Sequence, residues 1–137
     1  MRGPIPFLHF SGNCEEALHF YKECFGGEIV AIQRYSDSPG PVPEEHETKI
    51  LYSQFKAGDL LFMASDGPPN FHTYYGNQVS LNINFDSPVR EEKIFKSLSF
   101  GGTIDMPLED QFWGAKSGML TDKYGIKWML NCDKPKQ

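Results

Sequence analysis

The sequence lacks several features that mark large classes of proteins. No apolar run approaches the roughly 20 residues that a membrane-spanning helix needs, and the opening residues, Met-Arg-Gly-Pro-Ile-Pro, lack the apolar stretch of a signal peptide. Positive charge is also scarce, since 13 Lys and Arg face 18 Asp and Glu and leave a net charge of −5. Phosphate neutralisation requires a basic surface, so we expect a cytoplasmic protein with no nucleic-acid and no membrane partner.

Cysteine is scarce as well. The chain has three, Cys14, Cys24 and Cys132, without CxxC spacing or a zinc-type histidine partner. These features favour reduced, structural thiols over a redox or metal role. Cys14 and Cys24 share one helical pattern, in which a half-buried thiol acts as a small apolar side chain.

What the chain does have is 137 residues, of which 39% are hydrophobic and 14% aromatic, enough for one compact domain. Residues 7–29 align with residues 82–104 at a constant offset of 75 and share seven identities, among them Phe25-Gly26-Gly27 with Phe100-Gly101-Gly102. Residues 58–66 (GDLLFMASD) align with residues 125–133 (GIKWMLNCD) at an offset of 67. We therefore predict a single domain, 1–137, built from a duplicated half: module one spans about 4–66 and module two about 77–133.

Each half has the pattern of a strand, a helix and three further strands. Asn13, with Glu16 three residues later, predicts a capping box that opens the first helix, and Gly26-Gly27 ends it. Ser87 followed by Pro88 predicts the start of the second helix. The later strands are expected at 28–35, 49–55 and 60–64, then at 103–104, 118–120 and 126–130. The proline-rich and acidic residues 36–47 are expected to form a solvated loop that only the first half contains.

The opening strands predict which side chains face the helices. Leu81, Ile83 and Phe85 alternate with Ser80, Asn82 and Asn84, so the apolar set should face the helix and the polar set the opposite side. The offset of 75 places Leu8 and Phe10 with the apolar set. Phe7 and His9 then join Asn82 and Asn84 on the other face.

The segments PFLHFSGNCEEALHFYKECFGG, LLFMASD and FWGAKSGMLTDKYGIKWMLN together resemble the PhnB-like branch of the vicinal oxygen chelate superfamily, a branch labelled as similar to 3-demethylubiquinone methyltransferase. The resemblance covers almost the whole chain. It implies an α+β protein of the glyoxalase/bleomycin-resistance fold, in which two βαβββ modules form a curved, partly closed mixed sheet with helices on the outer face. It also implies a ligand cavity and a homodimer.

Superfamily enzymes that bind a metal use His, Gln or Glu from the opening and closing strands of both modules. By this resemblance the metal-ligand position of the closing strand is Met129, and its first-half counterpart at the offset of 67 is Phe62. The ligand positions of the opening strands lie near Ile5 and Ser80. Divalent metals prefer nitrogen and oxygen donors, so we expect no metal and no cofactor. We also disfavour methyl transfer, because a common S-adenosylmethionine site needs a glycine-rich turn before a helix, whereas both glycine pairs follow one.

The residues that we expect to contact a small-molecule ligand are His9, Phe7, Asn82, Asn84 and Trp113. Each has a plainer interpretation. His9, a possible general base or hydrogen-bond donor, could be a core histidine; the asparagines, which are uncommon in strands, could pair within the protein; Trp113 could fill the core instead of lining a pocket.

The function expected from these features is metal-free binding of a small molecule on the concave face of both modules, with sequestration of the ligand. The alternative is a metal-dependent enzyme of the same fold, resembling glyoxalases or dioxygenases, with its metal displaced to a site near His9. A third class is a dimeric interaction protein whose cavity is filled. The first function predicts a ligand pocket, the second predicts a bound metal, and the third predicts neither.

Overall fold

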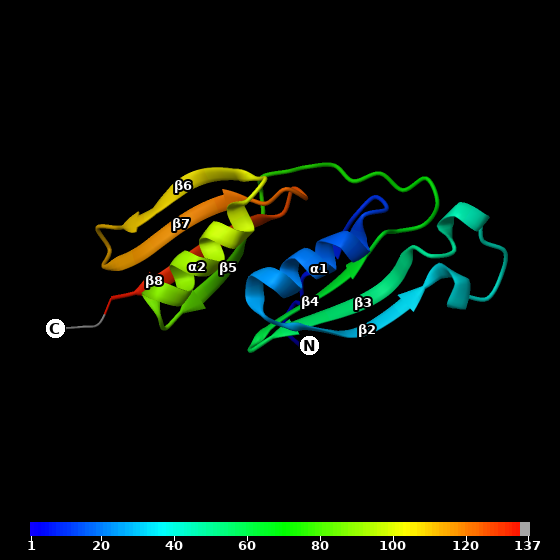
Figure 1. Cartoon of the computed structure of the whole chain (residues 1–137), viewed down its shortest axis with the longest axis horizontal. Helices are drawn as coiled ribbons and strands as arrows, with labels where there is room; N and C mark the ends of the chain where they lie inside the picture. Colours follow the sequence, from blue (N-terminus) through cyan, green and yellow to red (C-terminus); the bar gives the residue numbers. More distant parts are fainter. Residues whose placement is uncertain (135–137) are drawn as a thin grey trace. The chain divides into compact units, whose positions relative to one another are not determined.

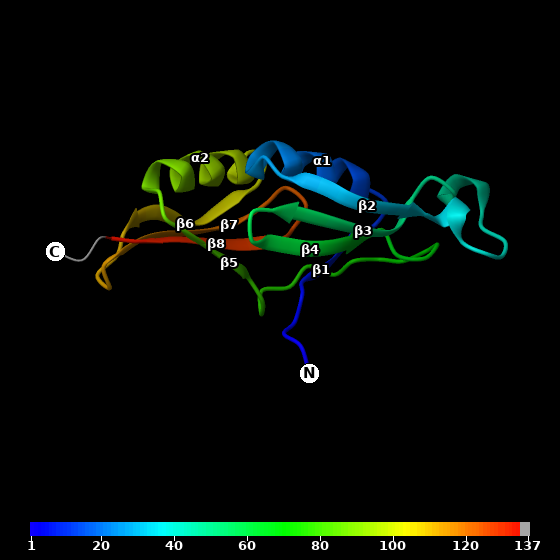
Figure 2. The same cartoon turned by 90° about the horizontal axis from the view of Figure 1, so that it is seen from below.

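The computed structural model describes residues 1–134 and forms two compact units of like architecture, the first ending at Tyr74 and the second beginning at Tyr75. Each unit contains one helix and one four-stranded sheet (Figure 1). Figure 2 shows that each helix covers one face of its own sheet and leaves the opposite face without a helix. Within the described residues, neither helix has the length and apolar character needed to cross a bilayer.

The first unit follows the predicted order of a strand, a helix and three strands. Its elements are β1 (Phe7–His9), α1 (Cys14–Phe25), β2 (Glu28–Arg34), β3 (Ile50–Ala57) and β4 (Leu60–Ser65). The sheet order is β1-β4-β3-β2; β1 runs parallel to β4, and the other pairs are antiparallel.

The second unit repeats this topology. Its elements are β5 (Leu81–Phe85), α2 (Pro88–Ser99), β6 (Thr103–Asp110), β7 (Ala115–Thr121) and β8 (Lys127–Asp133), in the sheet order β5-β8-β7-β6. The predicted α+β class and the two βαβββ modules are confirmed. The three later strands of this unit run further than the sequence pattern indicated, and each unit forms a mixed four-stranded sheet of its own.

Each helix packs on its own sheet through one apolar stripe. The Tyr21 ring of α1 meets Phe62 edge-on, with 5.5 Å between centroids. The α1 stripe is buried and consists of Cys14, Ala17, Leu18, Tyr21 and Cys24. The α2 stripe contains the buried residues Ile94, Phe95 and Leu98. Gly118 lets β7 approach α2 closely, because a Cβ there would lie 2.8 Å from the Phe95 ring.

The two helices begin differently, and one prediction was wrong. Ser87 caps α2 as predicted, accepting a hydrogen bond from the Arg90 backbone N–H at 3.2 Å. Asn13 occupies the N-cap position of α1 but makes no capping hydrogen bond with its side chain. The Asp66 carboxylate, which follows β4, accepts instead from the backbone N–H groups of Gly12 and Cys14 at 3.0 and 2.8 Å. Its other oxygen accepts from the Ile50 N–H at 2.8 Å.

The internal repeat also needs correction at its closing strands. Leu8 lies opposite Ala64, and Ile83 lies opposite Leu130. Since Leu8 and Ile83 are equivalent at the offset of 75, Ala64 and Leu130 are equivalent at 66, not at the predicted 67. A shift of one residue exchanges the faces of a strand. Phe62 is therefore fully buried beneath α1, and the true counterpart of Met129 is Met63.

The first unit alone carries a long connection between β2 and β3, as predicted. Residues 35–49 contain two short 3₁₀ turns, Tyr35–Asp37 and Glu44–His46, and most of their side chains are exposed. His46 is more constrained than its neighbours, because its Nε2 lies 2.9 Å from the Gly67 carbonyl oxygen and its ring lies 4.5 Å from that of Tyr35. The solvated loop is thus held at its base.

Glu91 is an unexpected part of the second core. It begins the buried stripe of α2, its side chain is fully buried, and neither carboxyl oxygen has a hydrogen-bond partner among the described residues. Burial raises the pKa of Glu91 from 4.5 to about 7, against the opposing effect of Lys116. The equivalent residue at the offset of 75, Glu16, is exposed on α1. The two glutamates are therefore identical in the repeat but differ in burial.

We expect Glu91→Gln to change how stability depends on pH. The folded protein holds a proton on Glu91 that the unfolded chain releases, because the folded pKa of about 7 exceeds 4.5. This preference stabilises the fold below pH 4.5 and is lost as the pH rises towards 7, a loss on the order of 3 kcal/mol. Urea unfolding from pH 5 to 8 should show a smaller decline in the variant, with Glu16→Gln as the control. Identical profiles for wild type and Glu91→Gln would contradict the assignment.

We expect Asp66→Ala to destabilise the protein by about 3 kcal/mol, because three backbone N–H groups lose a charged acceptor. Asn13→Ala is the matched control. It removes the residue at the N-cap position itself and should cost far less, since that side chain makes no capping bond. Denaturant midpoints measure both changes, and a larger loss in Asn13→Ala would mean that Asp66 does not cap the helix.

Candidate functional site

The sheet face opposite the helix, here called the free face, is the candidate site in each unit. Side chains alternate across a strand, so Leu8 beneath α1 leaves Phe7 and His9 on the free face of unit 1. Likewise Trp128, Leu130 and Cys132 are buried, whereas Asn82 and Asn84 are exposed. The face assignment made from the opening strands is confirmed.

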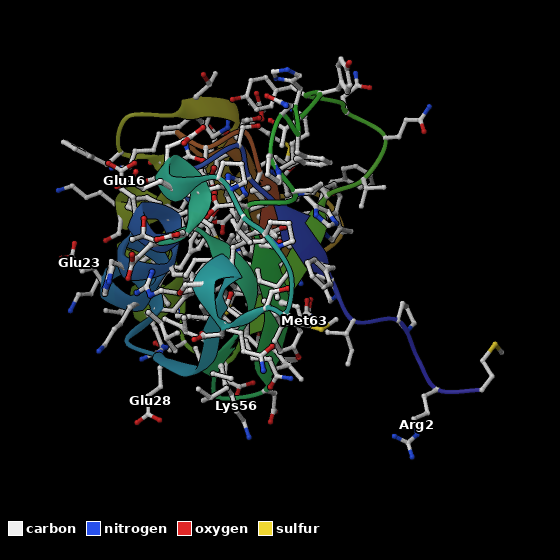
Figure 3. All side chains as sticks on the ribbon, turned by 90° about the vertical axis from the view of Figure 1, so that its right-hand side faces the viewer. Arg2, Glu16, Glu23, Glu28, Lys56 and Met63 are labelled. Carbon is white, nitrogen blue, oxygen red and sulfur yellow. The ribbon has the colours of Figure 1, made fainter. Side chains whose placement is uncertain are left out.

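Aromatic rings gather on the free face of unit 1. Phe7 and His9 are stacked, with 4.7 Å between ring centroids and 12° between their planes. Tyr52 lies 6.3 Å from Phe7, and Phe71 lies 5.9 Å from His9. Figure 3 shows Met63 on the same side of the sheet, away from α1, and Met63 is paired in register with Phe7. His9 is exposed and is therefore not the core histidine of the plainer interpretation.

A row of polar side chains crosses the free face of unit 2. This polar row consists of Asn84, Asn131, Ser117 and Glu109, which are neighbours in register on β5, β8, β7 and β6. Ser117 Oγ donates to Asn131 Oδ1 at 2.5 Å, and Asn131 Nδ2 donates to Asn84 Oδ1 at 3.3 Å. The row is thus linked from β7 to β5.

These bonds define the orientation of the Asn84 amide. Its Oδ1 accepts both from Asn131 and from Asn82 Nδ2, the latter at 3.2 Å. Asn131 Nδ2 also donates to Asp133 Oδ1 at 3.2 Å, so both of its protons are engaged. Turning the Asn84 amide over would place two donor groups against its own NH₂. Its Nδ2 therefore points away from this network, with no partner in residues 1–134, and is available as a donor.

Sulfur lies beside this polar row. The next row across the sheet, the methionine row, consists of Met129, Met119 and Met106, with Asn82 at its β5 end. All three methionines are partly buried. Methionine is flexible and polarizable, so it adapts to apolar ligands of different shapes. Asn131, Ser117 and the three methionines were not among the ligand-contacting residues predicted from the sequence. The alternation in residues 127–133 was the signal that could have placed Met129 and Asn131 beside Asn82 and Asn84.

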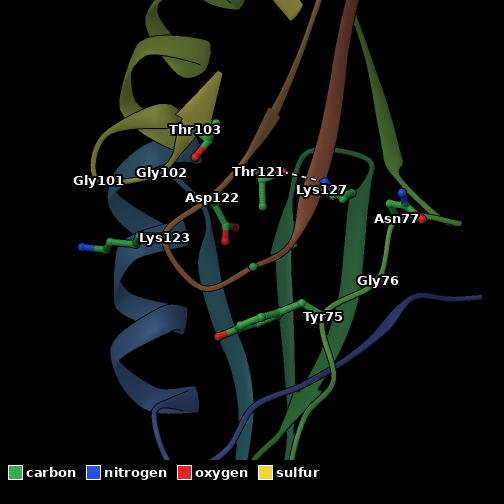
Figure 4. Close-up of a pocket in the computed structure, with 11 residues that line it drawn as sticks. Tyr75, Gly76, Asn77, Gly101, Gly102, Thr103, Thr121, Asp122, Lys123 and Lys127 are labelled. Atoms are coloured by element: carbon green, nitrogen blue, oxygen red, sulfur yellow. Dashed lines mark hydrogen bonds between the residues drawn. The ribbon is translucent and has the colours of Figure 1, made fainter. Parts of the chain in front are cut away.

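A separate hollow of about 660 Å³ lies at the end of the unit 2 sheet (Figure 4). Thr121 donates to Asp105 and accepts from Lys127 at its edge, at 2.7 and 2.8 Å. The Tyr75 ring lies so close to Gly125 that a Cβ there would be 2.3 Å away. None of the five predicted ligand residues lines this hollow, so the predicted site and the observed hollow are different places in the fold.

The burial of Trp113 and of the three cysteines shows which interpretation each residue fits. Trp113 lies half exposed in the turn between β6 and β7, edge-on to Phe112 at 5.1 Å, and does not fill the core. The three cysteines are buried and form no disulfide. Burial, together with the nearby Asp66 carboxylate, raises the pKa of Cys14 to about 12, which favours the inert thiol.

The positions that the family resemblance assigns to metal ligands do not fit a divalent ion. Ile5 and Ser80 lie outside the strands and are exposed, Phe62 faces α1, and Met129 lies in the methionine row. Replacing Phe62 by its true counterpart Met63 adds only another thioether. Within residues 1–134 no three His, Cys, Asp or Glu side chains are grouped as metal ligands would be, and hard divalent ions prefer oxygen and nitrogen donors.

Comparison with known proteins gives consistent matches along the whole chain. Residues 3–131 match the sequence model of the family described as 3-demethylubiquinone-9 3-methyltransferase. Protein YjdN of Escherichia coli is 28% identical over 94% of both chains. The crystal structure of PA1353 from Pseudomonas aeruginosa is 36% identical over 98% of this chain and 100% of its own, with a TM-score of 0.87.

A Bacillus cereus structure described as a putative 3-demethylubiquinone-9 3-methyltransferase, PhnB protein, is 32% identical over 96% of this chain and 99% of its own, with a TM-score of 0.79. More distant structures share the fold alone. They include the fosfomycin resistance protein FosX of Listeria monocytogenes, 11% identical with a TM-score of 0.66, and a glyoxalase/bleomycin resistance protein/dioxygenase family enzyme of Burkholderia phytofirmans, 13% identical with a TM-score of 0.64.

Proposed function

The chain belongs to the 3-demethylubiquinone-9 3-methyltransferase family, the PhnB-like branch of the vicinal oxygen chelate superfamily, and from this premise we propose that it is a metal-free small-molecule-binding protein. The free faces of its two sheets are the proposed binding surfaces, with His9 and Phe7 in unit 1 and Asn82 and Asn84 in unit 2. The ligand is sequestered there and is not transformed.

The observation that carries this proposal is the linked polar row of unit 2. Asparagine is depleted in strands, yet Asn82, Asn84 and Asn131 lie side by side on β5 and β8 and orient one another through hydrogen bonds. Packing does not require amides at these positions, because Asn82 and Asn84 are exposed. An oriented set of amides beside an apolar row is how small-molecule sites combine specificity with contact area.

Methyl transfer is not part of the proposal, despite the family description. Gly26 and Gly101 have φ values of 71° and 77°, and each lies just beyond the end of a helix. Gly27 and Gly102 are pressed against the backbone of the neighbouring strand. All four glycines serve the turn from helix to strand. A phosphate- or adenosine-binding turn would lie before a helix.

We expect ligand binding to respond to substitutions on the free faces. A thermal-shift screen of small molecules should find compounds that raise the melting temperature, because binding to the folded state stabilises it. Asn82→Ala and His9→Ala should weaken such compounds while changing the stability of the free protein by only about 1 kcal/mol. Asn13→Ala, an exposed amide that makes no capping bond, is the control. Hits that tolerate both substitutions would place the binding surface elsewhere.

We also expect protein purified without chelator to carry no stoichiometric divalent metal. The donors at the family positions are thioether, hydroxyl and hydrocarbon groups, and such a set does not retain zinc, manganese, iron or nickel. Elemental analysis measures the content directly, and added metal ions should leave the melting temperature unchanged. About one equivalent of any of these metals per chain would favour the metal-dependent enzyme with a site near His9.

Four expectations from the sequence stay predictions. The homodimer follows from the family resemblance, and Trp113 as a wall of the ligand site depends on what the exposed turn between β6 and β7 contacts. The same holds for the shared wall of His9, Asn82 and Asn84, because these residues belong to different units. Cytoplasmic localisation is likewise a proposal.

A further inference from the structure

We infer that the free face of unit 2 selects neutral ligands that present a hydrogen-bond-accepting oxygen, such as a carbonyl, next to an apolar body. The inference rests on the proposed function and specifies the chemical class of its ligand. It follows from three properties of this face: the direction of the Asn84 amide, the charge around it, and the thioether groups next to it.

The Asn84 side chain offers a donor because its oxygen is already used. Asn84 Oδ1 accepts from Asn82 and from Asn131 at 3.2 and 3.3 Å. Asn131 in turn is held by Ser117, which is fully buried. The orientation is thus set by three neighbours on the sheet. A ligand group that accepts a hydrogen bond from Asn84 Nδ2 is complementary to it, whereas a second donor meets an NH₂ group that cannot accept.

Charge on the same face acts against anions. Glu109 ends the polar row and Asp133 accepts from Asn131, and both carboxylates are exposed. Lys116 of β7 is paired with Glu92 of α2 on the helix side of the sheet. Lys127, which begins β8 on the same face as Met129, is engaged with Thr121 and Asp105. A carboxylate or phosphate ligand at Asn84 would therefore approach these two negative charges, whereas the cation of this face, Lys127, is already paired with Asp105. A neutral acceptor avoids this repulsion.

The methionine row accommodates the apolar body. Met129, Met119 and Met106 adjoin one another on three neighbouring strands, and Met129 is in register with Asn82. Residues two apart on a strand are separated by about 7 Å, so one ring and a short chain can reach from Asn84 to this row. Flexible thioethers adapt to the shape of the ligand's apolar body, while the Asn84 amide donates a hydrogen bond to the ligand's oxygen.

The test uses three probes with one phenylalkyl skeleton: 4-phenylbutan-2-one, 3-phenylpropanoate and 3-phenylpropylamine. NMR titration of the full-length protein follows the methyl groups of Met106, Met119 and Met129 and the side-chain NH₂ of Asn84. The ketone should shift all of these signals, and the carboxylate should bind at least about tenfold more weakly. A carboxylate that binds as tightly as the ketone, or a ketone that shifts none of the three methyl signals, would overturn the inference.

Asn84→Asp supplies the decisive variant, because it keeps the shape of the side chain and replaces the donor by an anionic acceptor. The ketone should lose about tenfold in affinity and the amine should gain. Asn13→Asp is the matched control and should change neither. A ketone affinity within about twofold of wild type in a folded Asn84→Asp variant would contradict the assigned donor. If screened compounds bind only the free face of unit 1, this inference fails while the proposed function stands.

Discussion

Both units depend on a glycine that has no room for a side chain. A Cβ on Gly27 would lie 2.5 Å from the Lys56 carbonyl oxygen, and one on Gly102 would lie 2.3 Å from that of Thr121. At this point the chain leaves the helix and enters β2 or β6, whose first residue pairs with the same neighbour. The close approach therefore fixes where the helix ends relative to the sheet. With the helix held over one face, the opposite face of each sheet is free for other contacts.

How far the sequence could predict this arrangement depended on the range of the interaction. Alternation along β5 is a local pattern, and it correctly separated Leu81, Ile83 and Phe85 from Asn82 and Asn84. The closing strands were misaligned by one residue because their turns differ: Gly58-Asp59 joins β3 to β4, whereas residues 122–126 join β7 to β8. Aligning the glycines hid this difference, and a slip of one residue exchanged the faces of Phe62 and Met63.

Interactions between distant residues were beyond prediction for a different reason. The α1 N-terminus is capped by Asp66, more than 50 residues away in the sequence, and nothing near Asn13 indicates this replacement. Glu91 is intermediate between the two cases. It precedes Ile94, Phe95 and Leu98 at the helical spacing of their stripe, so the periodicity alone would have placed it in the core. The expectation that charged side chains stay in water concealed it.

The two free faces share a fold but not a chemistry, and the difference bears on selectivity. Equivalent positions hold Phe7 and Asn82, His9 and Asn84, and the stacked ring pair of unit 1 has no counterpart in unit 2. In unit 2 the polar groups are held in place by one another, whereas the thioethers beside them remain adaptable. A surface of this kind discriminates strongly between polar groups, because a mismatched donor is left unpaired. It discriminates weakly between apolar shapes, because the thioethers adapt to them. Divergence at these few positions after duplication therefore suffices to give one of two similar sheets a face that selects its ligand by hydrogen bonding.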